Sequence, residues 1–92
     1  MSDSQRRVVE RVQTGVRVEK RILKVLKSIA EYNEISLGDL LEGIVLHSFE
    51  GKVPFSPESL KRIEQLKEVF ELDLKAEDSH LLQEESGTRT RP

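Results

Sequence analysis

The sequence has no cysteine and no tryptophan among its 92 residues, and aromatic side chains make up only 4% of it. Without cysteine, neither a disulfide nor a thiolate zinc site can stabilise the fold. No apolar run is long enough to span a bilayer, and no apolar signal segment follows the polar N-terminal residues. These absences argue against a disulfide-stapled secreted domain and a membrane protein, and they predict a cytoplasmic chain.

The residue combinations that catalysis and metal binding require are also missing. The two histidines, His47 and His80, are far apart in the sequence and have no cysteine beside them. Glu84 and Glu85 are adjacent carboxylates, but they lie in a polar tail with no pocket to shift a pKa. No nucleophile–base set and no glycine-rich phosphate loop is found. We therefore expect no enzyme activity, no metal site and no cofactor.

Charged residues are abundant in the sequence, and the two signs are unevenly distributed along it. The formal net charge is −2, from 15 basic and 17 acidic residues. Residues 1–27 hold 8 basic and 3 acidic residues, a net charge of +5, and residues 28–92 hold 7 and 14, a net charge of −7. This asymmetry indicates either a surface that faces a polyanion or a solvated basic face followed by an ordinary acidic tail.

The chain divides into four segments by composition and pattern. Residues 1–11 are a flexible basic arm, and residues 12–51 form a domain with regular apolar spacing. Residues 52–75 make a turn and a third helix, and residues 76–92 are a largely disordered acidic tail. A scaffold of 10.6 kDa without covalent staples usually gains stability by oligomerising.

Residues 12–18 alternate between apolar and polar side chains. Val12, Thr14, Val16 and Val18 share one face of this segment. Such alternation predicts a half-buried strand. Because no second strand is nearby in the sequence, the expected partner is the same strand of a second chain.

Two helices are predicted to follow the strand. Residues 20–32 separate apolar from polar side chains into two continuous arcs, and Asn33 suits the left-handed conformation that ends a helix. Ser36 caps a second helix over residues 37–50, which stops at Gly51. The apolar arc of this second helix covers about half of its circumference. A helix of this kind is covered from more than one side, which again favours a dimer core.

A third helix is predicted to begin at Ser56, with Pro57 in its first turn. It presents a narrow apolar stripe on one side. The residues of the stripe are Leu60, Ile63, Leu66, Phe70 and Leu74.

The order of strand, helix, tight turn and helix carries a family resemblance over residues 12–51. The residues that carry it are Val16-Arg17-Val18, Ile22, Leu26, Ile29-Ala30, Asn33, Ser36 to Leu41, Val45 and Phe49 to Gly51. In their joint spacing they resemble the ribbon-helix-helix family of DNA-binding proteins. The resemblance implies a mostly α fold in which two chains form an intertwined homodimer. An intermolecular antiparallel two-stranded β-ribbon would join the chains, and each would carry an extra C-terminal helix.

The resemblance also implies the residues that contact DNA bases. In the family the ribbon enters the major groove, and alternate strand residues face the base edges. Carried over by position, these residues are Gln13, Gly15 and Arg17. Arginine and glutamine can each bind a base edge through two hydrogen bonds.

Phosphate contacts are expected from the arm and from the starts of the first two helices, where backbone N–H groups and the helix dipole attract anions. The residues are Arg6, Arg7, Arg11, Lys20, Arg21, Ser36, Leu37 and Gly38. The alternative is a disordered basic arm with ordinary solvated charges on the first helix.

The resemblance further implies that eleven apolar residues of the domain form a core shared by two chains. This predicted dimer core consists of Val16, Val18, Ile22, Leu26, Ile29, Leu37, Leu40, Leu41, Ile44, Val45 and Phe49.

Two functional hypotheses follow from the sequence. The first is a homodimeric, sequence-specific DNA-binding transcriptional regulator, a repressor, whose third helix braces the dimer or joins neighbouring dimers on DNA. The second is an antitoxin or other protein-interaction module that dimerises through the same domain and binds a protein partner through residues 56–85. Neither hypothesis involves a membrane.

Overall fold

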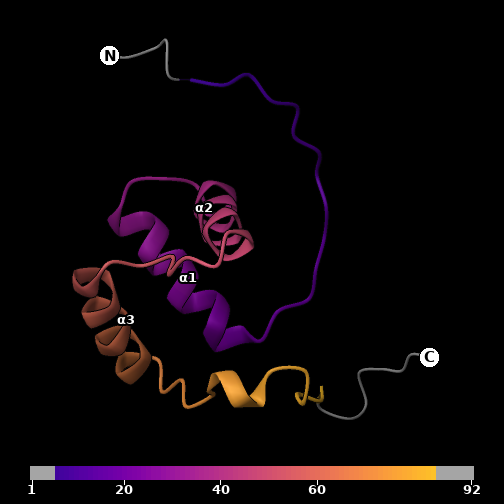
Figure 1. Ribbon diagram of the computed structural model, residues 1–92. Helices are drawn as coiled ribbons and strands as arrows, with labels where there is room; N and C mark the ends of the chain where they lie inside the picture. Colours follow the sequence, from indigo (N-terminus) through magenta and orange to yellow (C-terminus); the bar gives the residue numbers. More distant parts are fainter. Residues whose placement is uncertain (1–5, 85–92) are drawn as a thin grey trace.

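Three α-helices follow an extended N-terminal segment in the computed structural model, which describes residues 6–84 (Figure 1). The helices are α1 (Lys20–Tyr32), α2 (Leu37–Phe49) and α3 (Pro57–Val69), and a short 3₁₀-helix follows at Ala76–Asp78. The prediction of a mostly α fold is confirmed. Within residues 6–84, no helix has the length and apolar character needed to cross a bilayer.

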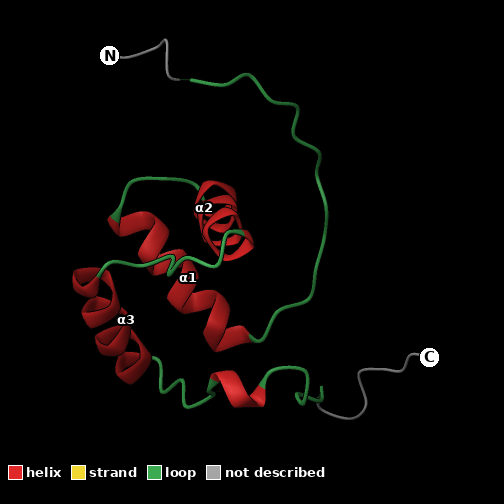
Figure 2. Cartoon of the chain, viewed as in Figure 1, coloured by secondary structure: helices red, strands yellow, loops and turns green. Residues whose placement is uncertain are grey.

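The β-ribbon is the prediction that the structure contradicts. No strand occurs in residues 6–84, and Figure 2 draws the segment before α1 as a loop. The predicted strand at residues 12–18, its intermolecular ribbon and the intertwined dimer built on it are therefore wrong. The valines of this segment are exposed, with Val12 at 80% and Val16 at 76%. Alternating side chains define the two faces of a strand, but hydrogen bonds to a neighbouring strand make a sheet. Residues 6–84 contain no other extended segment that pairs with this one.

Side-chain caps explain where the three helices begin. The hydroxyls of Ser36 and Ser56 each accept a hydrogen bond from the backbone N–H three residues later, at 3.1 Å in both cases. Both caps match the sequence prediction. Glu19 caps α1 in a way that the sequence analysis did not anticipate. Its carboxylate accepts hydrogen bonds from the backbone N–H groups two and three residues later, at 2.9 and 3.0 Å.

The three helices end in the same type of turn. The residue after each C-cap has a left-handed backbone, at Glu34 (φ 58°), Gly51 (φ 71°) and Glu71 (φ 56°). The next backbone N–H then donates to the carbonyl five residues back, at 3.0, 2.9 and 2.8 Å respectively, as in a Schellman motif. Asn33 is the C-cap of α1, but its backbone is right-handed, and Glu34 rather than Asn33 takes the left-handed conformation.

The core lies around α1, which packs against both α2 and α3. Its buried residues are Val25, Ile29 and Ala30 of α1 and Leu40 of α2. Half-buried apolar residues of the three helices and of the segments after α2 and α3 pack on this centre: Leu26, Ile44, Phe55, Ile63, Leu66, Phe70 and Leu72. The stripe predicted for the third helix is thus largely used inside this chain.

Candidate nucleic-acid interface

The segment before α1 carries most of the positive charge of the candidate site. We call residues 6–19 the arm. It runs in a wide arc past α2 and joins α1 at the end farthest from the turn between α1 and α2 (Figure 1). Its arginines are Arg6, Arg7, Arg11 and Arg17, and all four lie in exposed positions. The arm therefore presents a row of guanidinium groups outside the helical body.

Arg11 connects the arm to α2. Its Nε and Nη2 atoms donate to the two carboxylate oxygens of Glu42, both at 2.7 Å. The hydrogen bond and the charge of Arg11 lower the pKa of Glu42, and the pKa of Arg11 is raised by the same contact. This two-pronged ion pair holds the middle of the arm beside α2.

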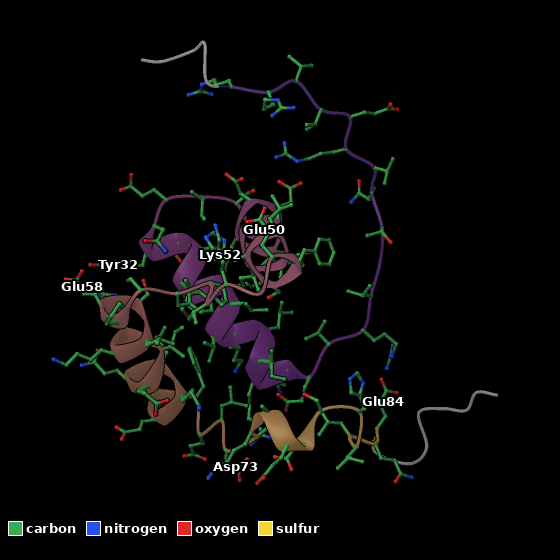
Figure 3. The ribbon with its side chains drawn as sticks, viewed as in Figure 1. Tyr32, Glu50, Lys52, Glu58, Asp73 and Glu84 are labelled. Atoms are coloured by element: carbon green, nitrogen blue, oxygen red, sulfur yellow. The ribbon has the colours of Figure 1, made fainter. Side chains whose placement is uncertain are left out.

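Arg17 lies near the base of the arm and contacts the C-terminal part of the described chain. Its Nε donates to Glu84 at 2.6 Å. Figure 3 shows Glu84 on the segment that follows the 3₁₀-helix, close to where the arm enters α1. The side chains of Arg17 and Glu84 are 79% and 50% exposed, so this ion pair lies in solvent.

Arg21, in the first turn of α1, has three partners. Its Nε donates to Glu19 at 2.9 Å, and its Nη1 donates to the backbone carbonyl of Glu71 at 2.9 Å and to Asp73 at 3.2 Å. Partial burial alone would raise the pKa of Glu19, but the hydrogen bonds from Arg21 and from the backbone lower it. Arg21 thus joins the start of α1 to the turn after α3.

The predicted base-contacting residues, Gln13, Gly15 and Arg17, all lie on the arm and are exposed. A side chain at Gly15 would meet nothing within 4 Å. Of the predicted phosphate contacts, the structure places Lys20 and Arg21 close to Arg17, because all three lie where the arm joins α1. We call these three residues the basic cluster.

The other predicted phosphate site, at Ser36, Leu37 and Gly38, lies away from the basic cluster. It begins α2, just past the far end of α1, and the 13 residues of α1 span about 20 Å. The hydroxyl of Ser36 is engaged by the backbone N–H of Asp39. The structure therefore does not bring this site and the basic cluster together.

The residues predicted for a dimer core fall into three groups. Ile29 and Leu40 are buried within one chain. The half-buried members are Ile22, Leu26, Leu37 and Ile44, and the exposed members are Val16, Val18, Leu41, Val45 and Phe49.

The outer side of α2 carries an exposed apolar face, which we define as Leu41, Val45, Leu46 and Phe49. Leu46 is 62% exposed and Phe49 is 80% exposed. Leu41, Val45 and Leu46 also line an open groove of about 520 Å³ between α2 and the arm. Leu46 was not among the predicted core residues, because it falls off the edge of the wide apolar arc of the second helix.

The acidic partners of the arginines were missed by the sequence analysis. Glu42, Asp73 and Glu84 lie 31, 52 and 67 residues away from the groups they contact. No local pattern connects residues so far apart. Only the packing of the helices and the path of the C-terminal segment bring them together.

Neither a protein-family model, nor a curated protein, nor a solved structure matches this chain.

Proposed function

We propose that this protein is a cytoplasmic DNA-binding regulator, a repressor of transcription, which binds duplex DNA through the arm and the basic cluster. One observation carries the proposal: four arginines lie exposed along an extended segment that leads into two more cations at the start of α1. Residues 6–27 hold 8 basic and 2 acidic residues, a net charge of +6. Such a charge concentration attracts the phosphate backbone and is the electrostatic signature of a nucleic-acid binder.

The dimensions of the arm suit a groove or a backbone of duplex DNA. Its 14 residues can extend over about 45 Å, which exceeds one helical turn of DNA at about 34 Å. Arg6, Arg7 and Arg11 would bind phosphates along this path. Gln13 and Arg17 have side chains that can distinguish base edges, so sequence preference is assigned to them. Because no ribbon forms in the described chain, the arm binds as a single extended segment in this proposal.

A homodimer is part of the proposal, with its interface on the exposed apolar face of α2. Apolar residues gathered on one side of a small domain commonly mark an interaction surface. A dimer would present two arms and two basic clusters to one duplex, which doubles the positive charge near DNA. In this arrangement, α1 and α2 correspond to the two helices of the ribbon-helix-helix resemblance.

The alternative of a partner-binding segment at residues 56–85 has less support. Ile63, Leu66 and Phe70 of this segment pack against the core of the chain itself. They are therefore not available to a protein partner unless α3 detaches.

The proposal is tested by fluorescence anisotropy with labelled duplexes, including a site selected from random sequences. We expect binding to weaken steeply, by roughly 1,000-fold, between about 50 and 200 mM salt, because about six phosphate contacts release counterions. Arg17→Ala should weaken binding to the selected site by about 1–3 kcal/mol and reduce its preference over other sequences.

The matched control is Lys61→Ala, which removes an exposed cation from α3, outside the arm and the basic cluster. This variant should bind the selected site as the wild type does. If the wild-type protein binds no duplex at 50 mM salt, the proposed function is wrong.

A further inference from the structure

An acidic part of the chain lies directly against the basic cluster. We define residues 71–84 as the acidic segment; it holds five acidic residues and one lysine, a net charge of −4. In Figure 1 this segment, in orange and yellow, leaves α3 and passes beneath the start of α1. This negatively charged segment therefore faces the positions to which we assign DNA binding.

Two carboxylates of the acidic segment bind two guanidinium groups of the basic cluster. Glu84 accepts a hydrogen bond from Arg17 at 2.6 Å, and Asp73 accepts one from Arg21 at 3.2 Å. Arg21 also donates to the backbone carbonyl of Glu71 at 2.9 Å. The contacts to Glu84 and Asp73 are made by side chains that are 50% and 84% exposed.

We propose that the acidic segment is an intramolecular competitor of DNA, whose carboxylates occupy the phosphate-binding groups of Arg17 and Arg21. The inference rests on the proposed function and adds its regulation. An N–H group that donates to a carboxylate cannot donate at the same time to a phosphate. Each paired carboxylate also reduces the positive potential that attracts DNA. Glu84 and Asp73 must therefore release Arg17 and Arg21 before a duplex can bind these two side chains.

The anchoring of the segment suits a competitor that stays attached. Leu72 packs against the core, and the carboxylate of Asp78 accepts a hydrogen bond from the backbone N–H of Lys75 at 2.8 Å. The packing of Leu72 holds the first part of the segment beside the core, and the hydrogen bond between Asp78 and Lys75 closes the 3₁₀-helix within the segment. A segment held in this way keeps the effective concentration of its carboxylates high.

The contacts themselves are weak enough to exchange. Exposed ion pairs contribute little to stability, because both partners remain hydrated and salt screens their attraction. The ion pairs of Arg17 and Arg21 with the acidic segment thus lower the affinity of the protein for DNA without blocking DNA permanently.

The test compares two double variants with the same change in net charge. Asp73→Asn with Glu84→Gln removes both carboxylates that bind the basic cluster. The control, Glu68→Gln with Glu77→Gln, removes two exposed carboxylates that make no ion pair with residues 6–84. Binding of a random-sequence duplex of 20 base pairs is measured by anisotropy at 50 mM salt.

We expect the first double variant to bind the duplex roughly two- to ten-fold more tightly than the control, since two exposed ion pairs no longer compete. The difference should shrink as salt is raised. An NMR signal of the Arg17 Nε–H group, recorded without DNA, should shift in Glu84→Gln and stay unchanged in Glu77→Gln.

The outcomes separate this inference from the proposed function. If the wild type binds DNA and the two double variants bind equally tightly, the competitor role is wrong and the proposed function stands. If the wild type binds no duplex, the proposed function fails and the competitor role fails with it. In that case a shifted Arg17 signal would show only an ion pair.

Discussion

At the scale of single residues, the arm is positioned by arginines that bind distant carboxylates. Arg11 binds Glu42 on α2, and Arg17 binds Glu84 beyond the 3₁₀-helix. All four side chains are exposed, so these contacts direct the arm without contributing much to the stability of the fold. The same guanidinium groups are those expected to bind DNA, and the carboxylates therefore influence both the path of the arm and its binding.

The contact between Arg11 and Glu42 gives a pH-dependent prediction. Because the hydrogen bond and charge of Arg11 hold the pKa of Glu42 below its ordinary value of 4.5, the contact is fully formed above that pH. It is lost as the pH falls through the lowered pKa. In Arg11→Gln we expect the pKa of Glu42 to rise to its ordinary value, as measured by NMR titration of the side-chain carboxyl carbon.

The control for this titration is Lys27→Gln, which removes an exposed cation from α1 and should leave the pKa of Glu42 unchanged. A Glu42 pKa that is the same in the wild type and in Arg11→Gln would show that the arm does not dock on α2.

At the scale of elements, the helix ends share one geometry but differ in how well their residues suit it. The left-handed position is filled by glycine after α2 and by glutamate after α1 and α3. A residue with a Cβ atom is less stable in this conformation by roughly 1–2 kcal/mol, and glycine has no such penalty. The ends of α1 and α3 therefore store strain that the end of α2 avoids.

Two substitutions with opposite expected signs test this difference. Glu34→Gly should raise the free energy of unfolding by up to about 1 kcal/mol, because the gain in the folded state exceeds the added freedom of the unfolded chain. Gly51→Ala should lower it by about 1 kcal/mol, since no side chain crowds this position and only its φ of 71° opposes alanine. Urea unfolding followed by circular dichroism measures both.

Each variant serves as the control for the other, because both change only the left-handed residue of a helix end. Changes of the same sign in the two variants would contradict this account of the helix ends.

At the scale of the whole molecule, the core is small and one side of it is left uncovered. Within residues 6–84, only four apolar residues are buried, and the apolar face of α2 defined above is exposed. Isolated exposed apolar residues are normal on protein surfaces, but several neighbours on one helix favour association. This face is the basis for the proposed homodimer.

The dimer is tested by sedimentation of charge variants. Phe49→Glu places a carboxylate on the exposed apolar face, at the C-terminal end of α2, and we expect it to shift the protein from dimer to monomer at about 50 μM, because an unpaired charge would be buried. Val69→Glu introduces the same charge at a residue of α3 that is 70% exposed, close to the 80% of Phe49. This control should remain a dimer.

A wild-type protein that sediments as a monomer at this concentration would remove the homodimer from the proposal. Equal behaviour of Phe49→Glu and Val69→Glu would place the interface elsewhere.

The helices were accessible to sequence reasoning because their signals are local. Each signal lies within a few residues of the helix or helix end that it predicts. The signals are the apolar period of residues 20–32, the serines before α2 and α3, and the glycine after α2. The observed bounds of α1 equal the predicted range. The cap at Glu19 was missed because glutamate is an uncommon capping residue, although its position just before the amphipathic stretch was a signal.

The strand and the contacts of the site depended on more than local pattern. Residues 12–18 have the alternation of a strand, but a strand also needs a neighbour for its backbone N–H and C=O groups, and residues 6–84 supply none. Likewise, arginines in the arm could be recognised from the sequence, but their carboxylate partners could not.

The sequence by itself determined three amphipathic helices, their starting points and the separation of a basic N-terminal part from an acidic remainder. These features depend on neighbours along the chain and on composition. The tertiary structure alone decided that α1 packs between α2 and α3, that the arm is extended without forming a sheet, and that acidic residues far along the chain reach Arg11, Arg17 and Arg21. Those decisions follow from packing and from charges that meet only after the helices have assembled.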